Sequence, residues 1–328
     1  LMMGCGSFVT AAAPAIGPTF GGIMTQYFTW RYIFICVLPV IVLASFIGYF
    51  CMSEQIINKH EKFDLLSFIA VALAFVSLIM GFSNLNQIVD DLVFVLGCFI
   101  IGIISLYYFT KRQLHIKNSL IRIEIFNHKG FTFHTLAIMF LQMTTLGYGL
   151  LLPTFVQIVL KQPATDAGVV LLPGAIVGAV FAPIGGLILD RLGAKKPIVL
   201  GLCCSFIATF CFLFFFKNLT YQSCILFYFI YSLGIGLIVG NTMTSAMSHL
   251  PKNLQADGNA TLQTLMQLSG GIGTSITATI LAFVQQGTNL YDGTNRGALF
   301  VLIFLMFNIN IVILSQYFAF KGGKKNEF

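Results

Sequence analysis

The chain has 328 residues, of which 57% are hydrophobic and 9% are charged. Soluble domains carry about 25% charged residues, because these cover the surface that faces water. The composition therefore excludes a soluble globular protein and predicts an integral membrane protein. The net charge of +7 is explained by a bias of basic residues toward the loops on one side of a membrane, so no nucleic-acid partner is expected.

Ten apolar runs are long enough to cross a hydrocarbon core, which needs about 20 residues per helix. They cover residues 2–24, 31–52, 65–84, 91–110, 131–156, 167–189, 197–216, 221–243, 263–285 and 297–319. The runs are continuous and do not alternate in polarity as the strands of a membrane barrel do. The sequence thus predicts an all-α polytopic membrane protein with about ten transmembrane helices.

Basic residues concentrate on alternate connections between these runs. Of the 18 Lys and Arg, one set of connections holds only Arg31, Lys161, Lys217 and Arg296, which leaves 14 for the other connections and the two ends. Because basic loops remain on the cytoplasmic side, the richer set and both chain ends are predicted to lie in the cytoplasm. Its longest connection, 111–130, mixes basic with apolar residues, which is typical of a short amphipathic helix on the membrane surface.

The eight cysteines contain no Cys-x-x-Cys pair, and most of them lie inside the apolar runs. Cysteine at such places acts as a small apolar side chain that fills space between helices. A metal site requires ligands at suitable spacing, and this sequence does not offer them. We therefore expect neither a metal nor a cofactor.

The first run carries a pattern of small residues, Gly-x8-Ala-x3-Gly-Pro-x2-Gly-Gly, at Gly4, Ala13, Gly17, Pro18, Gly21 and Gly22. Glycine lets two helices touch backbone to backbone, and proline removes a hydrogen bond and bends the helix. The pattern resembles the antiporter motif of major facilitator drug exporters, which has glycine in place of Ala13. In that family the motif lies on the fifth span, between the two halves of the transporter. The alternative is tight helix packing without a further role.

A second pattern, Gly-x3-Asp-Arg-x-Gly-x-Lys-Lys, lies between two runs at Gly186, Asp190, Arg191, Gly193, Lys195 and Lys196. It resembles a loop signature of the major facilitator superfamily, with Ala194 as an extra residue. A carboxylate at a helix end can accept hydrogen bonds or pair with arginine, and so hold a cytoplasmic gate shut. Gly193 would allow the tight turn. The alternative is a basic loop that only sets the topology.

Other segments extend the resemblance: residues 28–34 to an aromatic turn after the antiporter helix, 63–65 to the start of an extra helix pair, and 151–174 to two later spans. The whole chain resembles the fourteen-span drug:proton antiporters of that superfamily, in particular bacterial multidrug exporters of the lincomycin-resistance type. The resemblance implies the major facilitator fold. The ten spans would correspond to spans five to fourteen, and about 120 residues with the first four spans would be lacking.

The resemblance also implies a division of the chain. Residues 1–52 would form the last two helices of the N-terminal bundle, and 53–110 an extra helix pair between the bundles. Residues 111–130 would connect this pair to a six-helix C-terminal bundle at 131–320. Residues 321–328 would form a cytoplasmic tail.

The implied function is export of drugs or other lipophilic small molecules across the cytoplasmic membrane of a bacterium, by proton antiport and alternating access. Lipids, protons and the substrate would be the partners, with the proton gradient as the driving force. Proton coupling needs a titratable group inside the membrane. No Asp or Glu falls in the middle of a run, and the family's coupling acid lies on the first spans. His134, near the start of a run, is expected to be an interfacial histidine.

Polar residues on the apolar runs are candidates for a substrate path: Gln142, Thr145, Tyr148, Gln157, Asn241, Gln263 and Gln267. The first three share one helix face, and Tyr148 could offer its ring to a lipophilic cation. Hydrogen bonding between helices is the alternative for each residue. Two glycine groups, at positions 234, 236 and 240 and at 270, 271 and 273, are predicted to mark close helix packing.

Four other functions stay open to different degrees. A dedicated exporter of one lipid, siderophore or peptide would carry the same motifs. A membrane enzyme would need a catalytic cluster such as paired carboxylates, which the spans do not contain. A channel fits poorly with a resemblance to an alternating-access fold. A non-functional remnant would show the motifs without transport, since alternating access needs two bundles.

Overall fold

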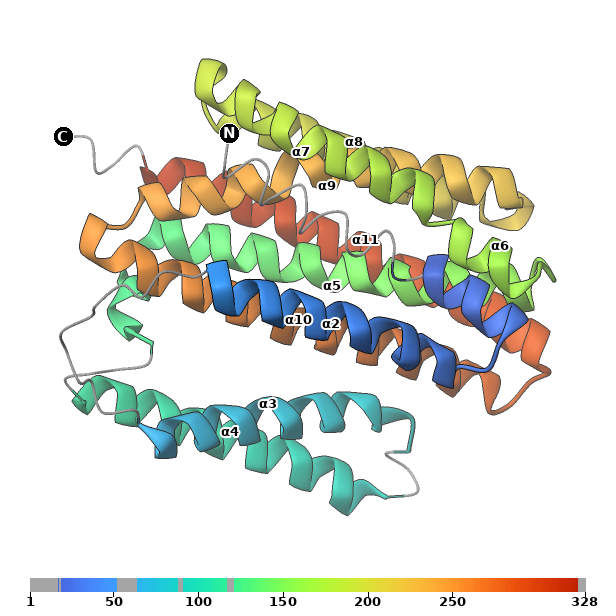
Figure 1. Cartoon of the computed structure of the whole chain (residues 1–328), viewed down its shortest axis with the longest axis horizontal. Coiled ribbons are helices and arrows are strands. Elements are labelled where there is room, and N and C mark those ends of the chain that lie inside the picture. The colour runs from blue at the N-terminus through green and yellow to red at the C-terminus, as the bar shows by residue number, and fades with distance from the viewer. Residues whose placement is uncertain (1–16, 18, 52–63, 88–90, 117–120, 324–328) are drawn as a thin grey trace.

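The computed structural model describes residues 17, 19–51, 64–87, 91–116 and 121–323, and these form helices joined by short loops (Figure 1). Residues 19–27 are helical. The α-helices that follow are α2 (Arg31–Cys51), α3 (Leu65–Ser83), α4 (Leu92–His115), α5 (Lys129–Ile158), α6 (Ala164–Val169), α7 (Leu172–Leu192), α8 (Lys195–Phe214), α9 (Tyr221–Ser248), α10 (Gln255–Gln285) and α11 (Leu290–Gly323). Short 3-10 helices are η1 (Leu85–Gln87), η2 (Ile123–Asn127), η3 (Phe216–Asn218) and η4 (Lys252–Leu254).

Within the described residues, nine helical segments are long and apolar enough to cross a membrane. Each corresponds to one of the predicted runs, and the predicted all-α polytopic membrane fold is confirmed. The remaining run, 2–24, lies mostly outside the described residues. Helix α2 has no buried residue, and side chains such as Leu38 and Ile41 are about 60% exposed. Such a helix requires an apolar environment, either lipid or other apolar helices.

The run predicted at 167–189 contains a break. Helix α6 ends at Val169, and α7 begins at Leu172 with Pro173 in its first turn. Proline is tolerated there because the first amides of a helix have no acceptor within the helix. The predicted run is therefore one short helix followed by one long helix.

Helix α5 lies at the centre of the C-terminal part, in contact with α9, α10 and α11. Helices α7, α8 and α9 pack together along one side of the molecule, and the α3–α4 pair runs along the opposite side (Figure 1). The largest apolar core surrounds the second half of α5 and includes Tyr148, Phe212, Tyr231 and Leu305.

Helices α7, α8 and α9 touch through their backbones. A Cβ added to Gly236 would lie 2.3 Å from the carbonyl oxygen of Gly178, and one on Gly234 would lie 2.5 Å from that of Gly201. Lipid is as apolar as a leucine side chain, so close van der Waals packing is what holds such helices together. Gly240, predicted to pack in the same way, has no atom within 4 Å of an added Cβ, and that prediction is wrong.

The connector predicted as a surface helix has another structure. Helix α4 continues to His115, and the described remainder contains the five-residue 3-10 helix η2. Ile125 of η2 is fully buried in a cluster with Phe131, Ala246 and Leu254. Ile125 and Phe126 of the connector therefore pack against α5, α9 and η4. The division of the chain into bundles stays a prediction.

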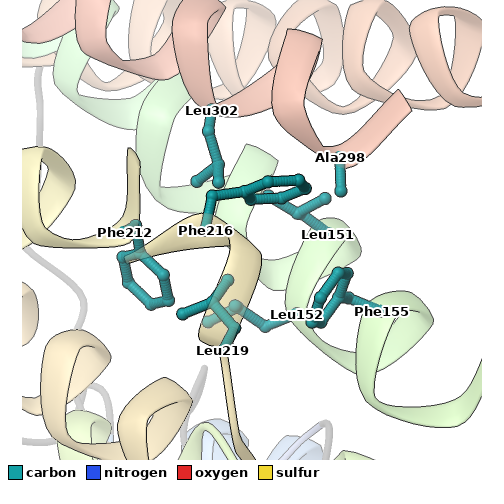
Figure 2. A pocket seen from close by; sticks show the side chains of 8 residues that line it. All are labelled: Leu151, Leu152, Phe155, Phe212, Phe216, Leu219, Ala298 and Leu302. Carbon is teal, nitrogen blue, oxygen red and sulfur yellow. The ribbon is translucent and has the colours of Figure 1, made fainter. Parts of the chain in front are cut away.

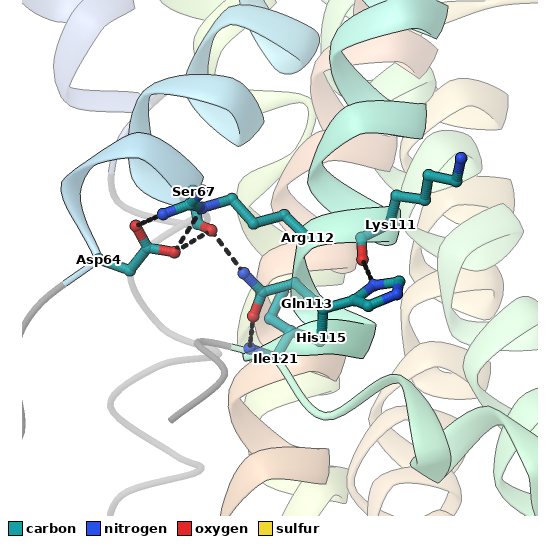
Figure 3. A network of polar contacts seen from close by, with 7 residues as sticks. All are labelled: Asp64, Ser67, Lys111, Arg112, Gln113, His115 and Ile121. Atoms are coloured by element: carbon teal, nitrogen blue, oxygen red, sulfur yellow. Dashed lines mark hydrogen bonds and ion pairs between the residues drawn. The ribbon is translucent and has the colours of Figure 1, made fainter. Parts of the chain in front are cut away.

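A network of polar side chains links α3 and α4 at one end of the pair (Figure 3). Arg112 donates from Nε and from its second guanidinium nitrogen to the two carboxylate oxygens of Asp64, at 2.9 and 3.0 Å. Ser67 also donates to Asp64, and the Gln113 amide donates to Ser67 at 2.7 Å. The Arg112 hydrogen bond, followed by that of Ser67, lowers the pKa of Asp64, which lies just outside the span.

This network predicts a defined pH dependence. Because the pKa of Asp64 is lower in the folded state, its stabilising effect is present above the unfolded value of about 3.9 and is lost as pH falls further. We expect Asp64→Asn to lower the Tm of the purified protein at pH 7 and to remove part of the decline in Tm below about pH 4. Asp190→Asn is the matched control, because the described residues give Asp190 no ion-pair partner. Parallel Tm curves for Asp64→Asn and the unmodified protein would contradict this assignment.

Candidate functional site

The described part of the small-residue helix, 19–27, packs against α6. A Cβ on Gly22 would lie 2.6 Å from the carbonyl oxygen of Ala164 and 3.1 Å from Cα of Gly168. Thr19 Oγ1 donates to the carbonyl oxygen of Gly168 at 3.2 Å. The amide of Thr165 donates to Gln26 Oε1 at 2.8 Å. Two helices far apart in the sequence therefore meet backbone to backbone, with a hydrogen bond on either side of Gly22.

An open cleft of about 210 Å³ lies beside this contact. Its walls are Gly21, Gly22, Thr25, Pro153, Gln157, Ala164 and Gly168. Pockets for drug-sized ligands usually measure about 300–1,000 Å³, so in this conformation the cleft accommodates only a smaller group. Gln157, predicted on the substrate path, is exposed and supplies an amide to the cleft.

The structure thus brings two predicted sets together, because Gly21 and Gly22 of the small-residue motif share a cleft with Gln157. Gly17 and Gly21 have no atom within 4 Å of an added Cβ, so among the described glycines of the motif Gly22 makes the close contact. Gly4, Ala13 and Pro18 lie outside the described residues. The functional role of the motif stays a prediction.

The predicted gating residues lie at the turn between α7 and α8. Gly193 ends α7 with φ +79°, a backbone conformation that glycine adopts without strain. Asp190, Arg191, Lys195 and Lys196 are exposed, and Gly186 has open space beside it. Among the described residues the ion pairs are Arg112–Asp64 and Arg122–Asp257. Asp190 therefore forms no ion pair with them in this conformation.

Two predicted substrate-path residues belong to a buried aromatic cluster. Tyr148 is fully buried, with its ring centroid 4.7 Å from that of Tyr231, and its hydroxyl donates to Thr209 Oγ1 at 3.0 Å. Thr145 Oγ1 lies 2.9 Å from the Tyr231 hydroxyl, within hydrogen-bond distance. In this conformation the Tyr148 hydroxyl is buried and bonded to Thr209, whereas Thr145 is half-buried and lies within hydrogen-bond distance of Tyr231.

The other candidates are spread over the bundle. Asn241 is buried and donates to the carbonyl oxygen of Leu237, whereas Gln263 and Gln267 are exposed on α10. Gln142 is half-buried on α5 beside Gly270. The seven polar candidates therefore do not form one site in this structure, and their assignment stays a prediction.

An apolar pocket lies beside the aromatic cluster, since Phe212, which packs on Tyr148, also lines this pocket (Figure 2). Its volume is about 10 Å³, roughly that of one water-sized probe. Side chains from α5, the α8–η3 region and α11 line it: Leu151, Leu152, Phe155, Phe212, Phe216, Leu219, Ala298 and Leu302. The pocket has no room for a ligand, and we assign it to the core.

Some residues with defined contacts were missed or misplaced from the sequence. Tyr228 and Tyr231, which pack beside Tyr148, stand three residues apart in an apolar run, and this spacing could have predicted one aromatic face. His134 is fully buried in the second turn of α5, and its Nε2 lies 3.0 Å from Ser245 Oγ. Nothing in the run around His134 indicated a polar partner on α9.

The long apolar helices and their small-residue contacts define a multi-span membrane protein. Residues 1–274 match the family model described as Major Facilitator Superfamily. The chain belongs to this superfamily. Its members are transporters, so the chain is not an enzyme, as expected.

Individual relatives are similar over most of the chain. Lincomycin resistance protein LmrB of Listeria monocytogenes is 30% identical over 295 residues, which cover 90% of this chain and 62% of the relative. LmrB of Bacillus subtilis is 32% identical over 286 residues, which cover 85% and 59%. The chain thus spans about three fifths of the length of these relatives. A solved bacterial homologue of the human lysosomal transporter Spinster matches 78% of this chain and 68% of its own, with 13% identity and a TM-score of 0.49.

Proposed function

We propose that the protein exports lipophilic small molecules, including antibiotics, from the bacterial cytoplasm by proton antiport and alternating access. The observation that carries the proposal is the backbone contact between Gly22 and α6, in a helix that resembles the antiporter motif. The names of the relatives, which refer to lincomycin resistance, support the substrate class. The membrane is the cytoplasmic one, with basic loops and both ends of the chain inside.

In this proposal the contact of residues 19–27 with α6 lies between the two halves that move. A contact made by glycine and backbone atoms is close enough to exclude solutes. Because it contains no interlocking side chains, the two halves can move apart there during transport. The nearby hydrogen bonds from Thr19 and Thr165 set its register. Gln157 is the polar contact for a substrate that reaches the cleft. Asp190 and the basic residues after it close the cytoplasmic side in another state; in this one they form no ion pair with any described residue.

The test is an efflux assay with the protein produced from its own gene in a bacterium that lacks other multidrug exporters. Cells loaded with ethidium and supplied with glucose should lose the dye faster than cells without the gene, and a protonophore should abolish the difference. Lincomycin should compete with ethidium. Extrusion of one compound only would indicate a dedicated exporter, and no extrusion of any compound would contradict the proposal.

A further inference from the structure

One end of α3 is fixed directly to α10. Ser83 Oγ lies 2.8 Å from Ser275 Oγ, within hydrogen-bond distance. Thr279 Oγ1 donates to the carbonyl oxygen of Phe82 at 2.8 Å. One turn deeper, a Cβ on Gly271 would lie 3.1 Å from the terminal methyl of Ile79, so α3 packs into a small-residue position of α10.

The other end of the α3–α4 pair is tied to the connector. Gln113, held by Ser67 in the Asp64–Arg112 network, accepts a hydrogen bond from the amide of Ile121 at 3.2 Å (Figure 3). The side chain of Gln113 is buried, and its bond to Ile121 is partly buried. The network therefore fixes the connector to both helices of the pair.

The connector is in turn anchored on the C-terminal helices. Arg122 Nε lies 3.2 Å from the carboxylate of Asp257 on α10, although an exposed ion pair of this kind stabilises the fold only weakly. Burial of Ile125 contributes more, because its side chain is completely removed from water. Thr132 on α5 also donates to the carbonyl oxygen of Phe126 at 2.8 Å.

These attachments lie at opposite ends of α3, which is about 28 Å long at 1.5 Å per residue. Attachment at two such distant places fixes the tilt of the pair as well as its position. Helix α2, which precedes the pair in the chain, has no buried residue and makes no extensive contact with the described part of α3 or α4.

We propose that the α3–α4 pair is a fixed part of the body formed by α5–α11 and moves with that body, not with the helices before it, during transport. The proposal rests on the proposed function in that it assigns the pair to one of two bodies that move against each other. Its contacts to α10 and the connector stay intact in every state. The contact between Gly22 and α6 changes.

The proposal is tested by joining α3 to α10 covalently. The two serine oxygens are close enough that Ser83→Cys and Ser275→Cys together should form a disulfide, in a background whose native cysteines are replaced by alanine. We expect ethidium efflux to change by less than about twofold when the disulfide is oxidised and then reduced. A loss of more than tenfold on oxidation, reversed by reductant, would overturn the proposal. Ser83→Cys alone is the control for the oxidant.

A distance measurement keeps the proposal testable if no variant transports. Spin labels on Val93 of α4 and Leu200 of α8, both exposed, should give one narrow distance that is the same with and without substrate and at high and low pH. A second pair of labels, on Tyr49 of α2 and Leu200 of α8, measures the motion of α2 relative to the α5–α11 body. A Val93–Leu200 distance that shifts with conditions would overturn the proposal. Absence of efflux in every form, with that distance constant, would count against the proposed function alone.

Discussion

Replacing Gly236 by alanine is expected to lower the Tm of the purified protein by about 2–12 °C. The added Cβ would lie 2.3 Å from the carbonyl oxygen of Gly178 and 3.1 Å from its carbonyl carbon, which are backbone atoms that no rotamer change can move. Helices α7 and α9 must therefore separate along their contact. Overpacking of this kind costs about 1–3 kcal/mol, which corresponds to this range of Tm for a protein of a few hundred residues.

Gly240→Ala is the matched control, since it lies about one turn further along α9 and nothing lies within 4 Å of its added Cβ. The two substitutions have the same helix propensity and differ only in the space available. Thermal unfolding in detergent, followed by light scattering or intrinsic fluorescence, measures the difference. Equal Tm values for the two variants would show that α7 and α9 are not in backbone contact at Gly236.

Replacing Gly22 by alanine is expected to reduce efflux about 5- to 150-fold while the protein stays folded. The new Cβ would meet the carbonyl oxygen of Ala164 at 2.6 Å, so residues 19–27 could no longer approach α6. The clash raises the free energy of the conformation that contains this contact by about 1–3 kcal/mol. The population of that conformation therefore falls about 5- to 150-fold. Export depends on this state in the proposed cycle.

Gly17→Ala provides the comparison, because this glycine of the same motif has no described atom within 4 Å of an added Cβ and does not line the cleft. Rates of ethidium loss should be near the unmodified value for Gly17→Ala and strongly reduced for Gly22→Ala, at equal amounts of protein in the membrane. If both variants export at the unmodified rate, the contact with α6 has no part in transport. If Gly17→Ala is the more impaired, the motif acts through a face other than that of Gly22.

Hydropathy predicted the spans well because one physical requirement dominates: a helix in lipid needs about 20 apolar residues. It did not predict where the helices end. Helix α10 begins at Gln255 and not near 263, and α11 begins at Leu290 and not near 297, since the polar turns continue the helix beyond the apolar run. The break between α6 and α7 was missed because both sides of it are apolar, although Pro173 marked the place.

The site was predictable only in part. Composition and spacing singled out Gly22 and Gly236, which do touch other helices, but also Gly21 and Gly240, which do not. Whether a glycine faces a neighbour depends on the rotation of its helix, and that is set by packing partners distant in sequence. The meeting of Gly22 with α6 joins residues about 140 positions apart, and no local pattern encodes it. The burial of Tyr148 has the same origin.

The most direct test of proton-driven export uses the purified protein in liposomes that enclose a pH-sensitive dye. With the proton gradient imposed across the membrane, addition of lincomycin or a lipophilic cation should accelerate proton movement, and the Gly22→Ala variant should show much less of this effect. Proton movement that does not depend on any added substrate, or is equal in liposomes without protein, would contradict the account.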